Sequence, residues 1–180
     1  YLAACDLAWF DGETLIVHGA VTDENLRLVP GEPDRAASVA AWVASLNGFI
    51  AAEVAVWRAE LTHPVDPAAE SWGGRGIVAY QCPVPGARLN QASVVYGRPT
   101  DDAGTPWLPS RAAVDALRRD GVKRLLVGHT PAGDAPALLR DEGFSFVMAD
   151  NSYGRHELGS RVTVDRAVRV RGETILDGGA

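Results

Sequence analysis

The sequence has no excess of basic residues, few cysteines and no long run of apolar residues. Its 180 residues include 17 Lys and Arg against 23 Asp and Glu, which gives a net charge of −6. Proteins that bind nucleic acid or anionic membranes through their general surface are usually basic, so we expect neither as a main partner. A phosphorylated substrate is compatible with this charge, because a bound cation can supply positive charge locally.

The cysteine content excludes a disulfide scaffold. The two cysteines, Cys5 and Cys82, are too few for such a framework, and their spacing matches no zinc ribbon. We expect both to be reduced and buried, as in a cytoplasmic protein. No stretch approaches the roughly 20 apolar residues of a transmembrane helix, and no signal-peptide pattern is present. The sequence therefore predicts a cytoplasmic location and no membrane association.

The first residues predict that the chain is part of a longer protein. It begins at Tyr1 rather than at Met, and residues 1–8 have the composition of a helix that is already under way. We therefore expect further residues upstream of Tyr1.

Alternating strand and helix patterns predict an α/β fold with a mixed sheet. Short β-favouring apolar runs indicate buried strands at 15–17, 124–127 and 144–148. Apolar residues spaced by three and four indicate a long helix from Asp34 to Leu61, and a second helix over 111–120 stops at Gly121. We also expect short strands at 77–80 and 93–96, a short helix at 135–140 and an edge hairpin within 161–176.

Ligand-capable side chains follow the three buried strands at their carboxyl ends. His18 and His129 each lie next to a glycine, and Asp150 follows the third strand. Functional groups collect at the carboxyl ends of strands in α/β sheets, and neutral imidazole is a common metal ligand. We therefore predict that the two histidines share one metal ion; the alternative is two hydrogen-bonded structural histidines. His63 and His156 lack this context, and we expect them at the surface.

A complete two-metal hydrolytic centre also needs carboxylates, which the sequence does not supply in a recognisable pattern. It contains no Asp-x-His and no Gly-Asp-x-x-Asp. The acids near the expected strand ends are Asp23, Glu24, Asp134 and Asp150. The ligand set predicted from this chain is therefore incomplete.

Two further residues are candidates for substrate binding. Arg98 follows an expected strand and could bind a phosphate through two parallel hydrogen bonds, or be an ordinary surface arginine. Asn151 could hydrogen-bond a substrate or orient a ligand histidine.

Two motifs, in this order, resemble those of the calcineurin-like metallophosphoesterases. Residues 15–20, LIVHGA, are similar to the family's VHGG motif, and residues 121–131, GVKRLLVGHTP, are similar to its GVKRVVVGHTP motif. The resemblance implies a four-layer α/β/β/α sandwich with two mixed sheets. It also implies two divalent metal ions (Mn, Fe or Zn) and a bridging hydroxide that attacks a phosphoester. His18 and His129 match two ligands of the second metal.

The departures from the family limit what the chain supplies. The motifs of the family's first half are absent, Ala20 replaces a glycine, and Pro131 stands where many members have a histidine. The resemblance therefore implies that residues 1–180 are the C-terminal part of a single domain, inactive alone, whose partner is the missing N-terminal half or another chain. Half of a two-sheet sandwich leaves an apolar sheet face uncovered, so we expect poor stability or self-association.

Two other functions stay open. One is a non-catalytic or degenerate half-domain that acts as a partner-binding module. The other is a mononuclear metal-binding or regulatory protein that uses His18 and His129 alone, although zinc usually takes three or four protein ligands.

Overall fold

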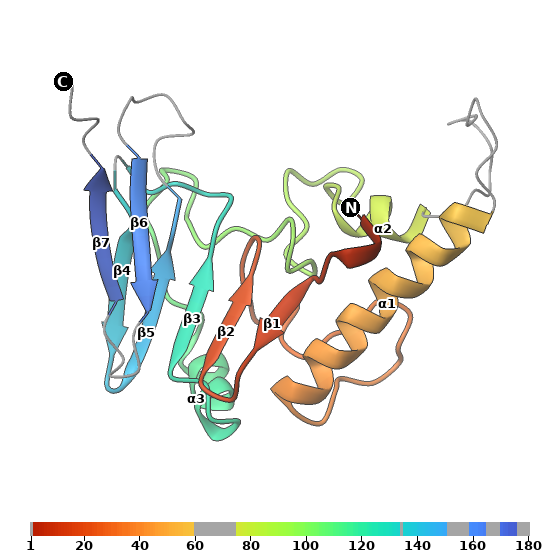
Figure 1. The fold of residues 1–180 in the computed structure, drawn as a ribbon, viewed down its shortest axis with the longest axis horizontal. Helices are drawn as coiled ribbons and strands as arrows, with labels where there is room; N and C mark the ends of the chain where they lie inside the picture. Colours follow the sequence, from red (N-terminus) through yellow and green to blue (C-terminus); the bar gives the residue numbers. More distant parts are fainter. Residues whose placement is uncertain (1, 60–74, 134, 151–158, 165–169, 176–180) are drawn as a thin grey trace.

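The fold combines helices with a five-stranded mixed sheet and a separate hairpin (Figure 1). A computed structural model describes residues 2–59, 75–133, 135–150, 159–164 and 170–175. The elements, in chain order, are the 3-10 helix η1 (Leu2–Ala4), β1 (Ala8–Phe10), β2 (Thr14–Val17), α1 (Val39–Ala59), α2 (Arg75–Tyr80), α3 (Arg111–Arg119), β3 (Arg124–Val127), β4 (Ala137–Asp141), β5 (Phe144–Met148), β6 (Gly159–Val164) and β7 (Val170–Ile175).

The five-stranded sheet has the order β1-β2-β3-β5-β4. Its three inner strands, β2, β3 and β5, run parallel to one another, and the edge strands β1 and β4 are antiparallel to their neighbours. This confirms the predicted α/β class with a mixed sheet. Because β2 and β3 are parallel neighbours, the residues that follow them emerge at the same edge of the sheet.

One face of the sheet carries the main core. Alternate strand residues such as Leu15, Leu125 and Phe146 are at most 1% exposed and belong to one cluster with Trp42 of α1 and Leu117 of α3. Side chains on a strand alternate between faces, so the intervening strand residues lie on the opposite face. The parallel strands read as apolar runs because both faces carry apolar side chains.

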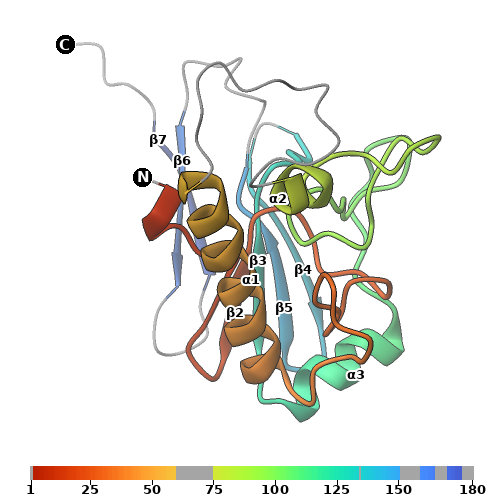
Figure 2. The same cartoon turned by 90° about the vertical axis from the view of Figure 1, so that its right-hand side faces the viewer.

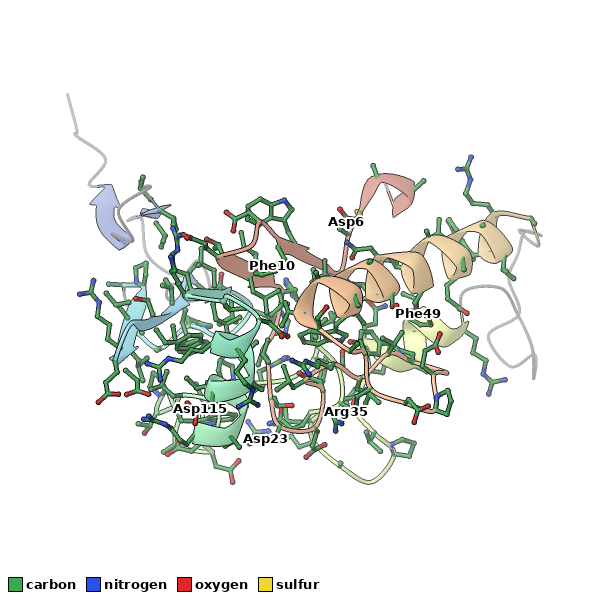
Figure 3. All side chains as sticks on the ribbon, turned by 90° about the horizontal axis from the view of Figure 1, so that it is seen from below. Asp6, Phe10, Asp23, Arg35, Phe49 and Asp115 are labelled. Carbon is green, nitrogen blue, oxygen red and sulfur yellow. The ribbon has the colours of Figure 1, made fainter. Side chains whose placement is uncertain are left out.

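Helix α1 packs one side onto this core. Among the residues that the structure describes, it is the one helix long and apolar enough, by length and composition, to cross a membrane. This corrects the expectation that no segment has that character. Trp42 and Leu46 are nevertheless completely buried against the sheet. Viewed from below, Phe10 lies on the side of the sheet that α1 covers, and Phe49 points from α1 toward α2, where it meets the ring of Tyr80 (Figure 3).

A side chain of α1 also closes the edge of the sheet at β1. The Asn47 side-chain oxygen accepts hydrogen bonds from the backbone N–H groups of Leu7 and Ala8, at 2.9 and 3.2 Å. Its amide nitrogen donates to the Ala8 carbonyl at 2.9 Å. The amide thus satisfies backbone groups that an edge strand otherwise leaves open to pairing with other chains.

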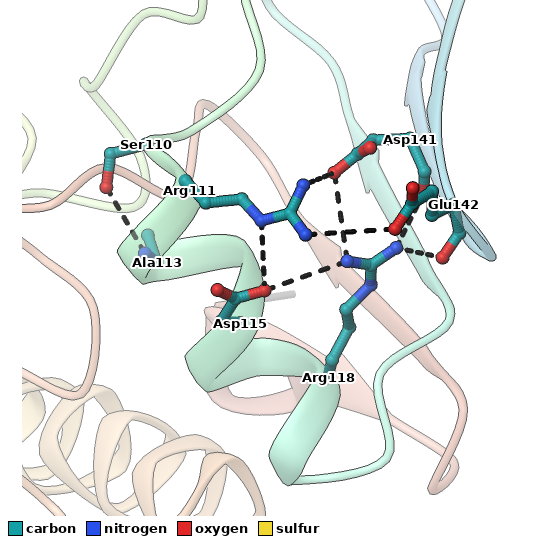
Figure 4. A network of polar contacts seen from close by, with 7 residues as sticks. All are labelled: Ser110, Arg111, Ala113, Asp115, Arg118, Asp141 and Glu142. Carbon is teal, nitrogen blue, oxygen red and sulfur yellow. Dashed lines mark hydrogen bonds and ion pairs between the residues drawn. The ribbon is translucent and has the colours of Figure 1, made fainter.

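Helix α3 is fixed at both ends and along its side. The Ser110 hydroxyl accepts from the Ala113 N–H at its start, and Gly121, at φ +91°, ends it in the left-handed region. Arg111 donates to the Asp141 carboxylate at 3.2 Å, and Arg118 donates to the backbone carbonyls of Asp141 and Glu142 (Figure 4). Exposed ion pairs contribute little energy, so this network mainly fixes α3 against the β4–β5 turn.

The hairpin β6–β7 forms a second layer on the side of the sheet opposite α3, as the view turned by 90° makes plain (Figure 2). Its two strands pair only with each other among the residues that the structure describes. The predicted hairpin near the C-terminus is confirmed, but it forms a separate two-stranded sheet instead of an edge of the main sheet.

Four predicted elements are wrong. The 3-10 helix η1 ends at Ala4 and Ala8 begins β1, residues 77–80 lie in α2, and residues 135–140 lead into strand β4 rather than forming a helix. Residues 93–96 form a turn, because the Ser93 hydroxyl accepts from the N–H groups of Val95 and Tyr96 and competes with strand pairing. Cys5 and Cys82 have reduced thiols but are half-buried rather than buried.

Candidate metal centre

The two predicted ligand histidines meet at the carboxyl edge of the sheet. His18 directly follows β2, and His129 follows Gly128 after β3. The Gly128 N–H donates to the His18 carbonyl at 2.9 Å, which extends the strand pairing up to the histidines. The His18 Nε2 and His129 Nδ1 atoms are 2.9 Å apart. The parallel pairing of β2 and β3 therefore brings together two side chains that are 111 positions apart.

Gly19 is required for close backbone packing rather than for an unusual φ angle. Its N–H donates to the Val94 carbonyl at 2.7 Å. A Cβ atom at this position would lie 2.4 Å from the Val95 carbonyl oxygen and 2.8 Å from that of Gly97. Real Cβ atoms do not approach backbone oxygens so closely, so only glycine fits between His18 and the 93–98 segment.

His129 is held in a strained backbone conformation. Its φ is +65°, in the left-handed region, and the Thr130 N–H donates to the Gly128 carbonyl at 2.8 Å across it. A hydrogen bond from residue i+2 to residue i around a positive φ defines a γ-turn of the rare, strained kind. Such strain costs about 1–3 kcal/mol and concentrates at functional sites. The strain therefore supports a functional role for the His129 imidazole.

A cation and an aromatic ring lie beside the histidines. The Tyr96 ring centroid is 6.3 Å from that of His129, and the Arg98 guanidinium carbon is 4.5 Å from the Tyr96 centroid. The Arg98 Nη1 donates to the carbonyls of Tyr96 and Gly97 at 2.8 and 3.0 Å, which fixes the guanidinium over the ring. The sequence predicted Arg98 as a candidate but not Tyr96, which carried no motif signal.

The charge environment favours a neutral His129. Burial lowers the pKa of His129 below its ordinary value, and the positive charge of Arg98 and the adjacent His18 lower it further. The Asp150 carboxylate, which follows β5, acts in the opposite direction. A neutral imidazole has a free lone pair, which is the form that binds metal ions.

A buried asparagine and a half-buried glutamine hold the segment that carries Tyr96 and Arg98. Asn25 is 0% exposed and donates to the carbonyls of Ala20 and Ser93, at 3.0 and 3.2 Å. The Gln91 side chain accepts from the Arg98 N–H at 3.0 Å. The sequence offered no sign of these roles, because an asparagine or glutamine in a loop is more often solvated.

The other acids predicted near the strand ends do not join the site. Asp23 accepts a hydrogen bond from the Ser110 hydroxyl at the start of α3. Glu24 is exposed, and its backbone carbonyl accepts from Arg35. Asp134, Asn151, His63 and His156 lie outside the described residues.

His18 and His129 can supply two of the ligands of one metal ion, which is an incomplete site. Two imidazole nitrogens bound to one tetrahedral ion at 2.0–2.1 Å lie roughly 3.3 Å apart. The separation of 2.9 Å is shorter than that value and is the length of a hydrogen bond between the two rings, which is the alternative expected from the sequence. No group of three or more His, Cys, Asp or Glu residues that could hold a metal ion exists in the described part of the chain. Further ligands would have to come from elsewhere.

Comparison of the chain with protein-family models, curated proteins and solved structures gives no match. The two histidine motifs therefore remain the basis for relating the chain to a family.

Proposed function

We propose that the chain supplies two imidazole ligands to a metal-dependent phosphoester hydrolase whose remaining ligands come from residues outside 1–180. The observation that carries this proposal is the pairing of His18 Nε2 and His129 Nδ1 at 2.9 Å, at the carboxyl ends of two parallel strands. Strain at His129 and the lowered pKa of its ring add support, since both favour a positioned, neutral ligand.

The proposal includes a finer fold. A five-stranded sheet with its helices on one face and a hairpin on the other is compatible with half of a four-layer α/β/β/α sandwich. The second sheet would then be completed by the residues that also carry the missing ligands.

In this function each residue has a defined task. His18 and His129 would hold one of two divalent ions (Mn, Fe or Zn), and a bound divalent ion supplies Lewis-acid chemistry at phosphorus. Arg98, fixed over Tyr96 beside His129, would offset negative charge on a phosphorylated substrate. Asn151 remains a predicted substrate contact.

The alternative is a non-catalytic half-domain that acts as a partner-binding module. The absence of a third metal ligand among the described residues favours it. Metal binding by the natural full-length protein separates the two functions, because a binding module has no need of a complete ligand set.

The test is calorimetric titration of the natural full-length protein with Mn²⁺ and Zn²⁺, together with hydrolysis of p-nitrophenyl phosphate. We expect His18→Ala and His129→Ala to remove one of two bound ions and to lower hydrolysis at least about 100-fold. Loss of a residue that only hydrogen-bonds a metal ligand already costs about 10–100-fold, so loss of the ligand itself should cost at least as much. His63→Ala, a histidine without the strand-end context, is the matched control. Tight binding of both ions by His18→Ala would refute the assignment.

A further inference from the structure

The sheet face opposite the main core carries a continuous apolar row. Strand register places Trp9 opposite Ile16, Ile16 opposite Leu126, Leu126 opposite Val147, and Val147 opposite Leu138. These five residues, the apolar row, alternate with the core residues along each strand, so they share the other face. The row crosses all five strands.

Much of this row is open to solvent. Trp9 is 49% exposed, Ile16 39% and Leu138 41%, whereas Val147 in β5 is 1% exposed. Two hollows of about 360 and 450 Å³ lie along the row, and Trp9, Ile16 and Leu126 line both. Exposed apolar surface of this extent marks an interaction site. The resemblance described above implies an uncovered sheet face of this kind.

The hairpin β6–β7 already covers one part of this face. It lies in front of β4 and β5, with β6 on the side nearer to β3 (Figure 1). Val164 of β6 lines the larger hollow together with Ile16 and Leu126. Among the described residues, β6 pairs only with β7, so its second edge faces the bare part of the row over β3, β2 and β1.

Of the two hollows, the smaller one reaches His18. The residues that line it include His18, Gly128, Trp9 and Asp6. A chain laid in it would cover the apolar row and pass next to His18. A pair of divalent ions needs several carboxylate ligands, and among the described residues Asp150 lies near His129 without forming a group of three ligands with the two histidines.

We infer that this face is the docking surface for an extended polypeptide that pairs with the second edge of β6 and covers Trp9, Ile16 and Leu126 with alternate apolar residues. Strand addition fits because it continues a layer that the hairpin has begun in front of the sheet. An anionic bilayer fits less well, since Asp6 and Asp11 stand at the rim of the hollows. The added strand would also bring a carboxylate to His18, and this part of the inference rests on the proposed function. The docking of the strand does not rest on it.

The test compares thiol reactivity at the bare face in two forms of the protein. Ile16→Cys, with Cys5 and Cys82 replaced by serine, is labelled with a maleimide in the natural full-length protein and in residues 1–180 alone. We expect labelling at least about 10-fold slower in the full-length protein, because labelling then requires local opening. Val84→Cys is the matched control: Val84 is 47% exposed, away from this face, and should react equally in both forms.

Hydrogen exchange of the β6 amides identifies the occupant. In an antiparallel pair alternate N–H groups point away from the partner strand, so a strand added at the second edge slows exchange at those residues of β6. Slow labelling of Ile16→Cys with fast exchange at β6 would mean that a helix, a second copy or a lipid covers the face, and would overturn the inference.

Equal labelling of Ile16→Cys in both forms would also overturn the inference. A natural protein that consists of residues 1–180 would give this result, because the two forms would then be the same. Neither readout depends on metal binding. If the full-length protein hydrolyses no phosphoester but its Ile16→Cys variant is labelled slowly, the proposed function is refuted and the docking surface still stands.

Discussion

Replacing Gly19 by alanine should destabilise the protein through a steric clash with backbone atoms. The added Cβ would lie 2.4 Å from the Val95 carbonyl oxygen and 2.8 Å from that of Gly97. Neither oxygen belongs to a flexible side chain, so the 93–98 segment must move away from His18. Overpacking in a close-packed region costs about 1–3 kcal/mol. A protein of this size loses about 2–4 °C in melting temperature per kcal/mol, so Gly19→Ala should lower it by about 2–12 °C.

The same chemical change elsewhere in the chain provides the control. Gly48 lies inside α1, and a Cβ there would meet nothing within 4 Å. Alanine is favoured over glycine inside a helix by about 0.5–1 kcal/mol, so Gly48→Ala should raise the melting temperature.

Thermal unfolding followed by circular dichroism compares both variants with the unmodified protein. The two glycine substitutions must shift the midpoint in opposite directions. A Gly19→Ala protein as stable as the unmodified one would show that the 93–98 segment yields without cost, and would refute the claim that Gly19 is fixed by close packing.

Two further predictions concern His129. His129→Gly should be more stable to urea than His129→Ala by about 1 kcal/mol, because alanine keeps the left-handed strain at φ +65° and glycine relieves it; equal stabilities would contradict the strain. The pKa of His129 is lower in the folded state than its ordinary value of 6.5, so the unfolded chain binds the proton more readily. Stability of the metal-free protein should therefore fall as pH drops below about 7 toward 5, and His129→Gln should reduce this slope in urea titrations; an unchanged slope would assign the pH dependence to other groups.

The sequence predicts those parts of the fold in which local pattern and burial agree. The inner strands β2, β3 and β5 carry apolar side chains on both faces and stand out as apolar runs, and the spacing of Trp42 and Leu46 identifies α1. The meeting of His18 and His129 follows from parallel neighbours, once both strands are known. The inner strands, α1 and the meeting of the two histidines can all be predicted from where the apolar patterns begin and end in the sequence.

Other parts depend on tertiary contacts that a local pattern does not contain. The segment 137–141 becomes a strand because β5 offers an edge, and its own residues favour a helix as readily. The turn at 93–96 depends on hydrogen bonds to Ser93, and its position depends on the buried amide of Asn25. The placement of Tyr96 and Arg98 beside His129 follows from this polar network, so the site beyond the two histidines could not be predicted.

The side-chain amide of Asn47 makes the protection of the β1 edge depend on the packing of helix α1. Because the Ala8 N–H and carbonyl at the start of β1 are bound by one side chain from α1, they are protected only while α1 remains in place. A fluctuation that releases α1 would open the backbone of β1 and the apolar core beneath it at the same moment. The first step of aggregation in this protein is therefore expected to be the undocking of α1, rather than the separation of any two strands.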